Sequence, residues 1–259
     1  ALVRDKESGV FFHPDKLHAL DFKGKYYSVK GPLNSSRSPQ GRPVIVQAGS
    51  SEAGTDLAAE TADVIFTAQQ TLEEAQAFYK KVKQKVVDFG RSPDDVKIMP
   101  GVSPYVGKTV EEAYEKYEKL QQLITPEIGL DFLSEYLGGF DVSGYDLDGP
   151  LPDVIPETNG NKSRRQLIID LAKRENLTIR ELYLRVAGSR GHRIIFGTPE
   201  QIADQLEEWI SNDAADGFNL MFSHLPNSLE DFVTTVVPIL QQRGIFPVSY
   251  KHLTLPTIA

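Results

Sequence analysis

Cysteine is absent from the 259 residues, and the chain has only two methionines and one tryptophan. Without thiols there can be no disulfide, no thiolate nucleophile and no cysteine-based metal site. The lack of cysteine also fits a cytoplasmic location, where disulfides are rare, although it does not require one. Chemistry in this protein must therefore rest on other side chains.

Long apolar runs and dense basic patches are also missing. No run approaches the roughly 18 apolar residues of a membrane span, and residues 1–10 lack the pattern of a signal peptide. The 28 basic residues are outnumbered by 36 acidic ones, which gives a net charge of −8. We therefore expect a soluble protein that binds neither membranes nor nucleic acid.

Strand and helix patterns alternate along much of the chain. Short β-branched runs predict buried parallel strands at residues 44–48, 63–68, 96–102 and 217–222, with a weaker fifth candidate at 193–197. Capped helices follow several of them, as at Thr71 with Glu74 and at Thr198 with Gln201. This alternation is typical of an α/β fold in which helices cover a parallel sheet.

The number of strands distinguishes a complete barrel from a partial one. A complete (β/α)8 barrel has eight strands in about 250 residues, whereas this chain shows four convincing strands and the weaker fifth. Regular alternation stops at residues 125–191, where helical patterns flank a Pro-, Gly- and Asp-rich stretch at residues 140–161. We predict the C-terminal half of a (β/α)8 TIM barrel over residues 1–246, with a helical insertion before the last strand-helix units that acts as a lid.

The strongest local sign of a ligand site is the strand at 44–48, which runs into Gly49-Ser50-Ser51 and a helix. Such a turn presents free backbone N–H groups and the positive end of the helix dipole, which together bind phosphate. An ordinary N-cap serine without a ligand explains the same spacing. His192 could donate a hydrogen bond or move a proton near neutral pH, or it could simply bond a loop carbonyl.

Other kinds of site have little support in the sequence. The histidines at 13, 18, 224 and 252 show no ligand spacing with one another or with carboxylates, so no metal site is predicted. Gly-x-Gly-x-x-Gly and Walker loops are absent, which excludes the usual dinucleotide and nucleotide folds. Trp209 lies on an apolar helical stripe and is predicted to be a core residue.

Several segments carry a resemblance when they are taken together and in order. They are GKYYSVKGPLN at 24–34, RSPQGRP at 37–43, VQAGSSEAG at 46–54, DVS at 141–143 with DGPLP at 148–152, SRGH at 189–192, GTPE at 197–200 and DGFNL at 216–220. In combination they resemble the nitrilotriacetate and dibenzothiophene-sulfone monooxygenase family, a branch of the bacterial-luciferase-like flavin monooxygenases. No single segment would be specific.

The resemblance implies a (β/α)8 barrel that binds FMN as FMNH2, activates O2 and inserts one oxygen atom into a small organic substrate. A separate NAD(P)H-dependent flavin reductase would supply the FMNH2, and the full-length parent protein would be a homo-oligomer. The resemblance also implies that Ser51 and Ser50 hold the FMN phosphate, while Gln47, Ala48 and Gly49 line the flavin. His192 becomes the candidate catalytic residue.

Two departures from the family pattern and two alternatives accompany this interpretation. Family members extend further before the region seen here, so we expect this chain to be a C-terminal fragment. Residues 247–259 have no counterpart in the family and resemble translated adapter sequence, with a genuine variable tail as the alternative. The alternatives in function are a deazaflavin-dependent oxidoreductase of the same superfamily and a non-catalytic ligand-binding fragment.

Overall fold

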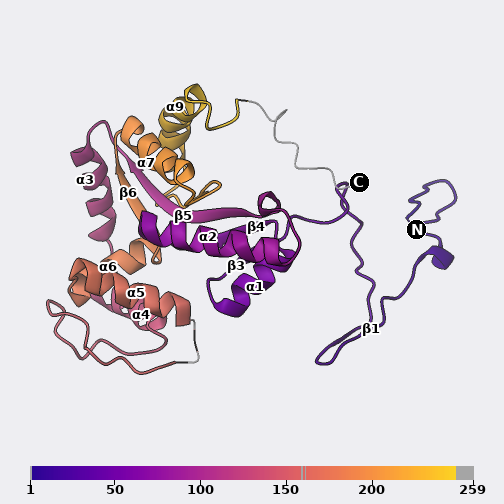
Figure 1. Cartoon of the computed structure of the whole chain (residues 1–259), viewed down its shortest axis with the longest axis horizontal. Coiled ribbons are helices and arrows are strands. Elements are labelled where there is room, and N and C mark those ends of the chain that lie inside the picture. The colour runs from indigo at the N-terminus through magenta and orange to yellow at the C-terminus, as the bar shows by residue number, and fades with distance from the viewer. Residues whose placement is uncertain (1, 159, 161, 249–259) are drawn as a thin grey trace. The chain divides into compact units, whose positions relative to one another are not determined.

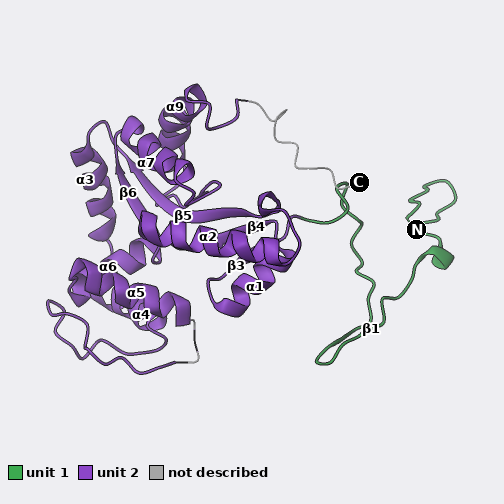
Figure 2. Ribbon diagram, viewed as in Figure 1, with its two compact units in different colours: residues 1–43, 255–259 green, residues 44–254 purple. Residues whose placement is uncertain are grey.

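The computed structural model describes residues 2–158, 160 and 162–248, and Figure 2 shows its division into two units. The first unit comprises residues 1–43 and 255–259; its described part contains a short 3-10 helix, η1 (Pro14–Lys16), and a hairpin of β1 (Phe22–Lys23) and β2 (Ser28–Val29). The second unit comprises residues 44–254 and holds the main sheet. From residue 249 onward the predicted tail lies outside the described residues.

A parallel sheet of five strands forms the middle of the second unit (Figure 1). The strands are β3 (Val46–Ala48), β4 (Val64–Thr67), β5 (Lys97–Val106), β6 (Arg193–Gly197) and β7 (Asn219–Leu220). The first four are neighbours in that order, β7 pairs with β5, and every pairing is parallel. The predicted α/β class with a parallel sheet is confirmed, and the weaker fifth candidate is a regular strand.

The two halves of β5 pair with different neighbours. Residues 97–100 pair with β4, whereas residues 102–106 pair with β6. Because β6 begins just beyond the level at which β4 ends, the residue that precedes β6 lies level with the C-terminal ends of β3 and β4. This stagger explains how His192, at the start of a strand, reaches the same edge of the sheet as residues at strand ends.

Helices α1 (Glu52–Thr61), α2 (Leu72–Asp88), α3 (Val110–Gln121) and α7 (Pro199–Ser211) follow β3, β4, β5 and β6 along the chain, with a 3-10 turn, η2 (Pro93–Asp95), before β5. The predicted helix starts are confirmed. Thr71 accepts a hydrogen bond from the N–H of Glu74, and Thr198 and Gln201 form a reciprocal capping box. Trp209 is buried on α7, as predicted.

The last helix of the described chain is interrupted. The sequence predicts one helix from Ser228 to Arg243, and the structure has α8 (Asn227–Asp231), a π-helical turn η3 (Phe232–Val236) and α9 (Val237–Gln242) in succession. Pro238 lies in the first turn of α9 and has no N–H to continue the α-helical ladder. A π turn accommodates this break while Phe232, Val236 and Leu240 still pack into one core cluster.

Residues 125–191 form a helical subassembly of α4 (Pro126–Tyr136), α5 (Lys162–Glu175) and α6 (Ile179–Ser189). A core cluster of its own includes Leu133 and Leu182. The sequence suggests hinges in the stretch at 140–161. In the structure this stretch is fixed to the cluster by one buried side chain, Val142, and by four partly buried ones, Phe140, Leu147, Leu151 and Ile155. The stretch and the helices are therefore packed together.

Candidate functional site

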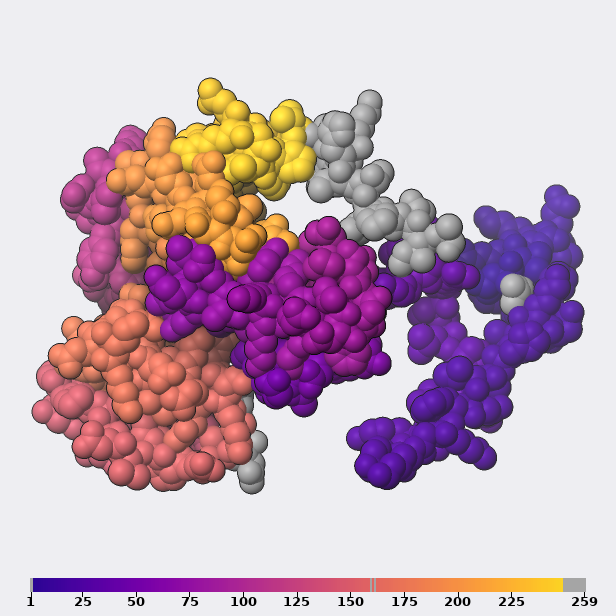
Figure 3. Space-filling model, in the orientation of Figure 1, coloured from indigo at the N-terminus to yellow at the C-terminus, as the bar shows by residue number. Residues whose placement is uncertain are grey.

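A pocket of about 410 Å³ lies at the C-terminal ends of β3 and β4. Its lining residues are Ala48, Gly49, Ser50, Ser51, Phe66, Thr67, Ala68, Gly160, Lys162, Ser163, Arg164, Leu167 and His192. In Figure 3 the salmon surface that includes α5 adjoins the purple surface that includes α1 and α2. The volume lies within the range of about 300–1,000 Å³ that is typical of small-molecule sites.

The turn after β3 supplies one wall of this pocket. Gly49 has φ +146°, a backbone conformation that favours glycine. Ser51 is the N-cap of α1, and its Oγ accepts a hydrogen bond from the N–H of Gly54 at 3.1 Å. The N-cap interpretation of Ser51 is therefore correct, but it does not exclude a ligand, because the same hydroxyl can also donate its proton.

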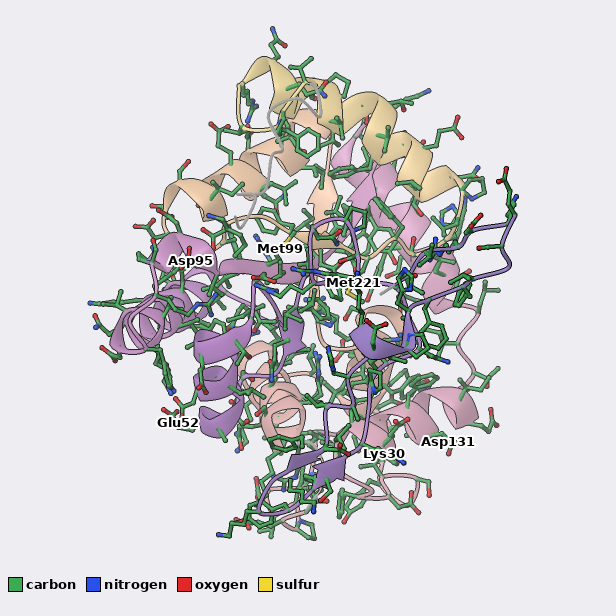
Figure 4. All side chains as sticks on the ribbon, turned by 90° about the vertical axis from the view of Figure 1, so that its right-hand side faces the viewer. Lys30, Glu52, Asp95, Met99, Asp131 and Met221 are labelled. Carbon is green, nitrogen blue, oxygen red and sulfur yellow. The ribbon has the colours of Figure 1, made fainter. Side chains whose placement is uncertain are left out.

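The first carboxylate of α1 is engaged away from the pocket. Glu52 is bonded to Lys81 at 2.5 Å and to Lys85 at 2.7 Å, both on α2, and Figure 4 shows it at the periphery of the molecule. These hydrogen bonds lower the pKa of Glu52 to about 2. Among the described residues that line the pocket there is no Asp or Glu, whereas Lys162 and Arg164 are cationic. The pocket is thus electropositive.

Gln47 is the one predicted flavin contact that does not line the pocket. It lies on β3 directly before Ala48, and its side-chain Oε1 is buried with no hydrogen-bond partner in the described part of the chain. A buried acceptor without a partner is energetically costly and needs an explanation. The structure gives this atom no access to the pocket, so the role of Gln47 as a flavin contact stays a prediction.

His192 is packed against two sheet residues. Its ring stacks on Phe66 at a centroid distance of 5.0 Å and an interplanar angle of 18°, and its side chain is only 3% exposed. A Cβ added to Gly101 would lie 2.4 Å from Nδ1 of His192. Only glycine at position 101 therefore leaves room for the imidazole.

The two ring nitrogens of His192 have different surroundings. Nε2 lies 3.5 Å from Nη2 of Arg164, and a guanidinium can only donate, so we assign the ring proton to Nδ1. Nδ1 has no partner within the described residues. Burial first, and then the charges of Arg164 and Arg190, lower the pKa of His192 to about 4. The imidazole is consequently neutral near pH 7 and can donate a hydrogen bond from Nδ1.

The loop that carries His192 is held from two sides. Gln70, which follows β4, donates to the carbonyl of Gly191 at 2.6 Å, and Arg164 donates to the carbonyl of Arg190 at 2.9 Å. Sequence patterns do not single out Gln70, Arg164 or Phe66, because their roles depend on contacts between distant segments. The one available signal is the strand–helix boundary after β4, where site residues of parallel sheets gather.

No cluster of three or more potential metal ligands occurs in the part of the chain that the structure describes. Over the same residues, every helix is too short or too polar to cross a membrane.

Comparison with known proteins identifies the family. The luciferase-like monooxygenase family matches residues 16–215, and these include the β3–α1 turn and His192. The chain belongs to this family. The identification agrees with the parallel sheet and with the pocket at its C-terminal edge.

Two curated relatives and one solved structure illustrate the similarity. N-acetyl-S-(2-succino)cysteine monooxygenase of Bacillus subtilis is 55% identical over 98% of this chain and 58% of its own length. Nitrilotriacetate monooxygenase component A of Aminobacter aminovorans is 53% identical over 98% of this chain and 56% of its own length. A riboflavin lyase structure with modified FMN and riboflavin matches with a TM-score of 0.75 and 32% identity over 96% of this chain and 54% of that one. The chain thus spans about half the length of the curated relatives it matches.

Proposed function

We propose that this chain is part of an FMN-dependent monooxygenase, which uses FMNH2 and O2 to insert one oxygen atom into a small organic substrate. The observation that carries the proposal is the electropositive pocket, which unites the β3–α1 turn with the buried, neutral His192. We also propose that the five-stranded sheet is the C-terminal half of a (β/α)8 barrel and that α4–α6 are an insertion in it. The share of the relatives' length that the chain covers supports this architecture.

The described residues fit FMN in their chemistry. The N-terminus of α1, with Ser50 and Ser51, would hold the phosphate through backbone N–H groups and hydroxyls. Ala48 and Gly49 would line the flavin, and Gln47, which precedes them on β3, stays a predicted flavin contact. Bound FMNH2 would supply the two electrons and activate O2.

The remaining residues of the pocket would protect and orient the reacting groups. Phe66 and Leu167 provide apolar surface that would exclude water from the pocket. Exclusion of water prevents side reactions in which reactive intermediates are hydrolysed. His192 would donate a hydrogen bond from Nδ1 without carrying a charge.

The names of the two curated relatives bear on the partner protein and on the choice between the alternative functions. A separate NAD(P)H-dependent flavin reductase would supply FMNH2, as the name "component A" of one relative suggests for a divided system. Both curated relatives are named monooxygenases, which favours O2 activation over a deazaflavin hydride carrier. The homo-oligomeric state and the cytoplasmic location stay predictions.

The experiment that tests the proposal is a flavin titration of two variants at Ser51. Ser51→Asp should abolish FMN binding, because the carboxylate would repel the phosphate. Ser51→Asn is the matched control, since Asn and Asp are both good N-caps and the helix start should persist in each. We expect fluorescence quenching of FMN to show binding by wild type and Ser51→Asn and none by Ser51→Asp. Equal binding by both variants would refute the phosphate site, and no binding by wild type would favour the non-catalytic fragment.

A further inference from the structure

Two residues in the left-handed conformation directly precede His192. Arg190 has φ +54° and Gly191 has φ +76°, and Arg190 is the C-cap of α6. This conformation suits glycine but is unfavourable for a residue with a side chain, such as Arg190. An unfavourable backbone conformation persists only where the surrounding contacts fix it. The direction in which His192 leaves α6 therefore depends on the contacts that hold these two residues.

The carbonyl groups of both residues accept hydrogen bonds from side chains of other elements. Arg164 of α5 donates to the carbonyl of Arg190 at 2.9 Å, and Nε2 of Gln70 donates to the carbonyl of Gly191 at 2.6 Å. Arg164 also lines the pocket and lies 3.5 Å from the ring of His192. Gln70, by contrast, is not among the lining residues. The contact of Gln70 with the site therefore runs through the backbone of the loop.

Gln70 is anchored independently of this loop. It lies between the end of β4 and the start of α2, and its backbone N–H donates to Oε2 of Glu74 at 3.2 Å. The other carboxylate oxygen of Glu74 lies 3.1 Å from Nη1 of Arg174 on α5. The amide of Gln70 thus extends from a turn that is fixed to two helices, and it ties the loop after α6 to that turn.

The imidazole of His192 has little freedom in its position. A Cβ on Gly101 would lie 2.4 Å from the ring, and the ring stacks on Phe66 with only 3% of the residue exposed. Protein interiors are packed so closely that a small shift of such a ring is felt. If the backbone before the ring moves, the ring either collides with the sheet or tilts away from Phe66 and meets water. The hydrogen bond at Gly191 therefore bears on both the orientation and the hydration of the imidazole.

We propose that Gln70 is a positioning residue, whose hydrogen bond to Gly191 holds the imidazole of His192 against Phe66 at the wall of the pocket. A group that acts on reacting atoms is effective only when its surroundings hold it close to the productive geometry. Gln70 supplies this support from outside the pocket. The inference rests on the proposed function for the chemistry of His192, whereas the positioning itself can be tested without turnover.

The test compares Gln70→Met with Gln76→Met by NMR of the whole chain. Methionine keeps the length of glutamine and removes the donor. Gln76 is the matched control, because its Nε2 donates to the carbonyl of Asn212 at 2.8 Å, which is also distant in sequence but not in the loop of His192. The ring signals of His192 are assigned with His192→Gln. They report two quantities, which are the upfield shift caused by the stacked ring of Phe66 and the pH at which the imidazole titrates.

In Gln70→Met we expect a smaller upfield shift and a titration midpoint that rises by about one pH unit. Burial is the main cause that lowers the pKa of His192 to about 4, and water at the ring would weaken this effect. Arg164 and Arg190, whose charges also lower this pKa, are unchanged in both variants. Gln76→Met should keep the wild-type value of both quantities. A purely structural role of Gln70 would affect the two variants alike, since each loses one bond of the same kind.

An unchanged shift and midpoint in Gln70→Met, or equal changes in the two variants, would overturn the inference. Loss of FMN binding in Gln70→Met would do the same, because a residue outside the pocket should leave the Kd of FMN at its wild-type value. If Gln70→Met fails to fold, Gln70→Asn gives the same comparison, since its side chain is one methylene shorter and falls short of Gly191. A wild-type chain that binds no FMN would refute the proposed function and leave the result for Gln70 intact.

Discussion

His192 illustrates how burial fixes the charge of one residue. Its imidazole stacks on Phe66, lies over Gly101 and faces the guanidinium of Arg164, so a second positive charge on the ring would be both desolvated and repelled. The pKa falls to about 4, from 6.5 in the free side chain. Between these two values the unfolded chain binds a proton that the folded chain does not, and the stability of the fold therefore rises with pH in this window.

We predict that His192 contributes about 3 kcal/mol to the loss of stability between pH 6.5 and pH 4. The contribution of this group is constant above about pH 6.5 and falls as the pH drops toward 4. Urea unfolding at several pH values should show a steeper slope for wild type than for His192→Gln, because the other titrating groups are common to both. His18→Gln, at an exposed position in the first unit, should keep the wild-type slope. Parallel slopes in wild type and His192→Gln would contradict the prediction.

The residues of the site differ in how well the sequence predicts them. Ala48 to Ser51 follow from a local pattern of strand, glycine turn and helix, and they do line one pocket. Arg164 does not follow from any local pattern, because it reaches His192 from 28 residues away through the packing of α5. The stagger of β6 on β5, which brings His192 to this edge, is likewise a property of pairing and not of composition.

At the scale of elements, β5 is longer than the sequence predicts. Prolines at 100 and 104 and the intervening Gly101 suggest an end near Val102, yet the strand continues to Val106. Proline weakens the hydrogen-bond ladder between two strands only where its missing N–H would have donated to the neighbouring strand. Pro104 lies beyond the residues of β5 that pair with β7, so one side of the strand has no partner strand there among the described residues. The extension is what allows β6 to join.

Asp216, which lies shortly before β7, joins β5 and α2. Its carboxylate accepts hydrogen bonds from the backbone N–H of Ile98 on β5 at 2.8 Å and from the hydroxyl of Tyr79 on α2 at 3.0 Å. It also pairs with Lys83 of α2 at 2.9 Å, and both charged side chains are largely buried. Burial and the neighbouring carboxylate raise the pKa of Tyr79, so its hydroxyl stays protonated and continues to donate.

We predict that Asp216→Asn destabilises the fold by about 3 kcal/mol, because removing one partner leaves a buried lysine without its counter-charge. Asp213→Asn, three residues earlier and exposed, should change the free energy of unfolding by less than about 0.5 kcal/mol. Urea denaturation of both variants at neutral pH measures the difference. Equal stability of the two variants would show that the Asp216 contacts contribute little.

For the whole molecule, the exposed edge of β3 bears on whether copies of the chain associate. It pairs with β4 on one side, and no other described strand pairs with it. Val46 is 60% exposed, and Val44 and Ile45 beside it are also exposed. An uncovered apolar edge strand offers backbone N–H and C=O groups to another chain, which natural proteins usually prevent with charge or closure.

We predict that the chain self-associates through this edge and that Val46→Lys suppresses the association. In an edge-to-edge dimer the added lysines would meet like charges and lose apolar contact, whereas β3 could still pair with β4. Val87→Lys is the matched control. Val87 is also exposed, at 49%, but it lies on α2 and not on the edge strand. Light scattering after size exclusion should show a mass that rises with concentration for wild type and Val87→Lys and a constant monomer mass for Val46→Lys. A wild-type chain that stays monomeric at every concentration would mean that something other than β-pairing protects the edge of β3.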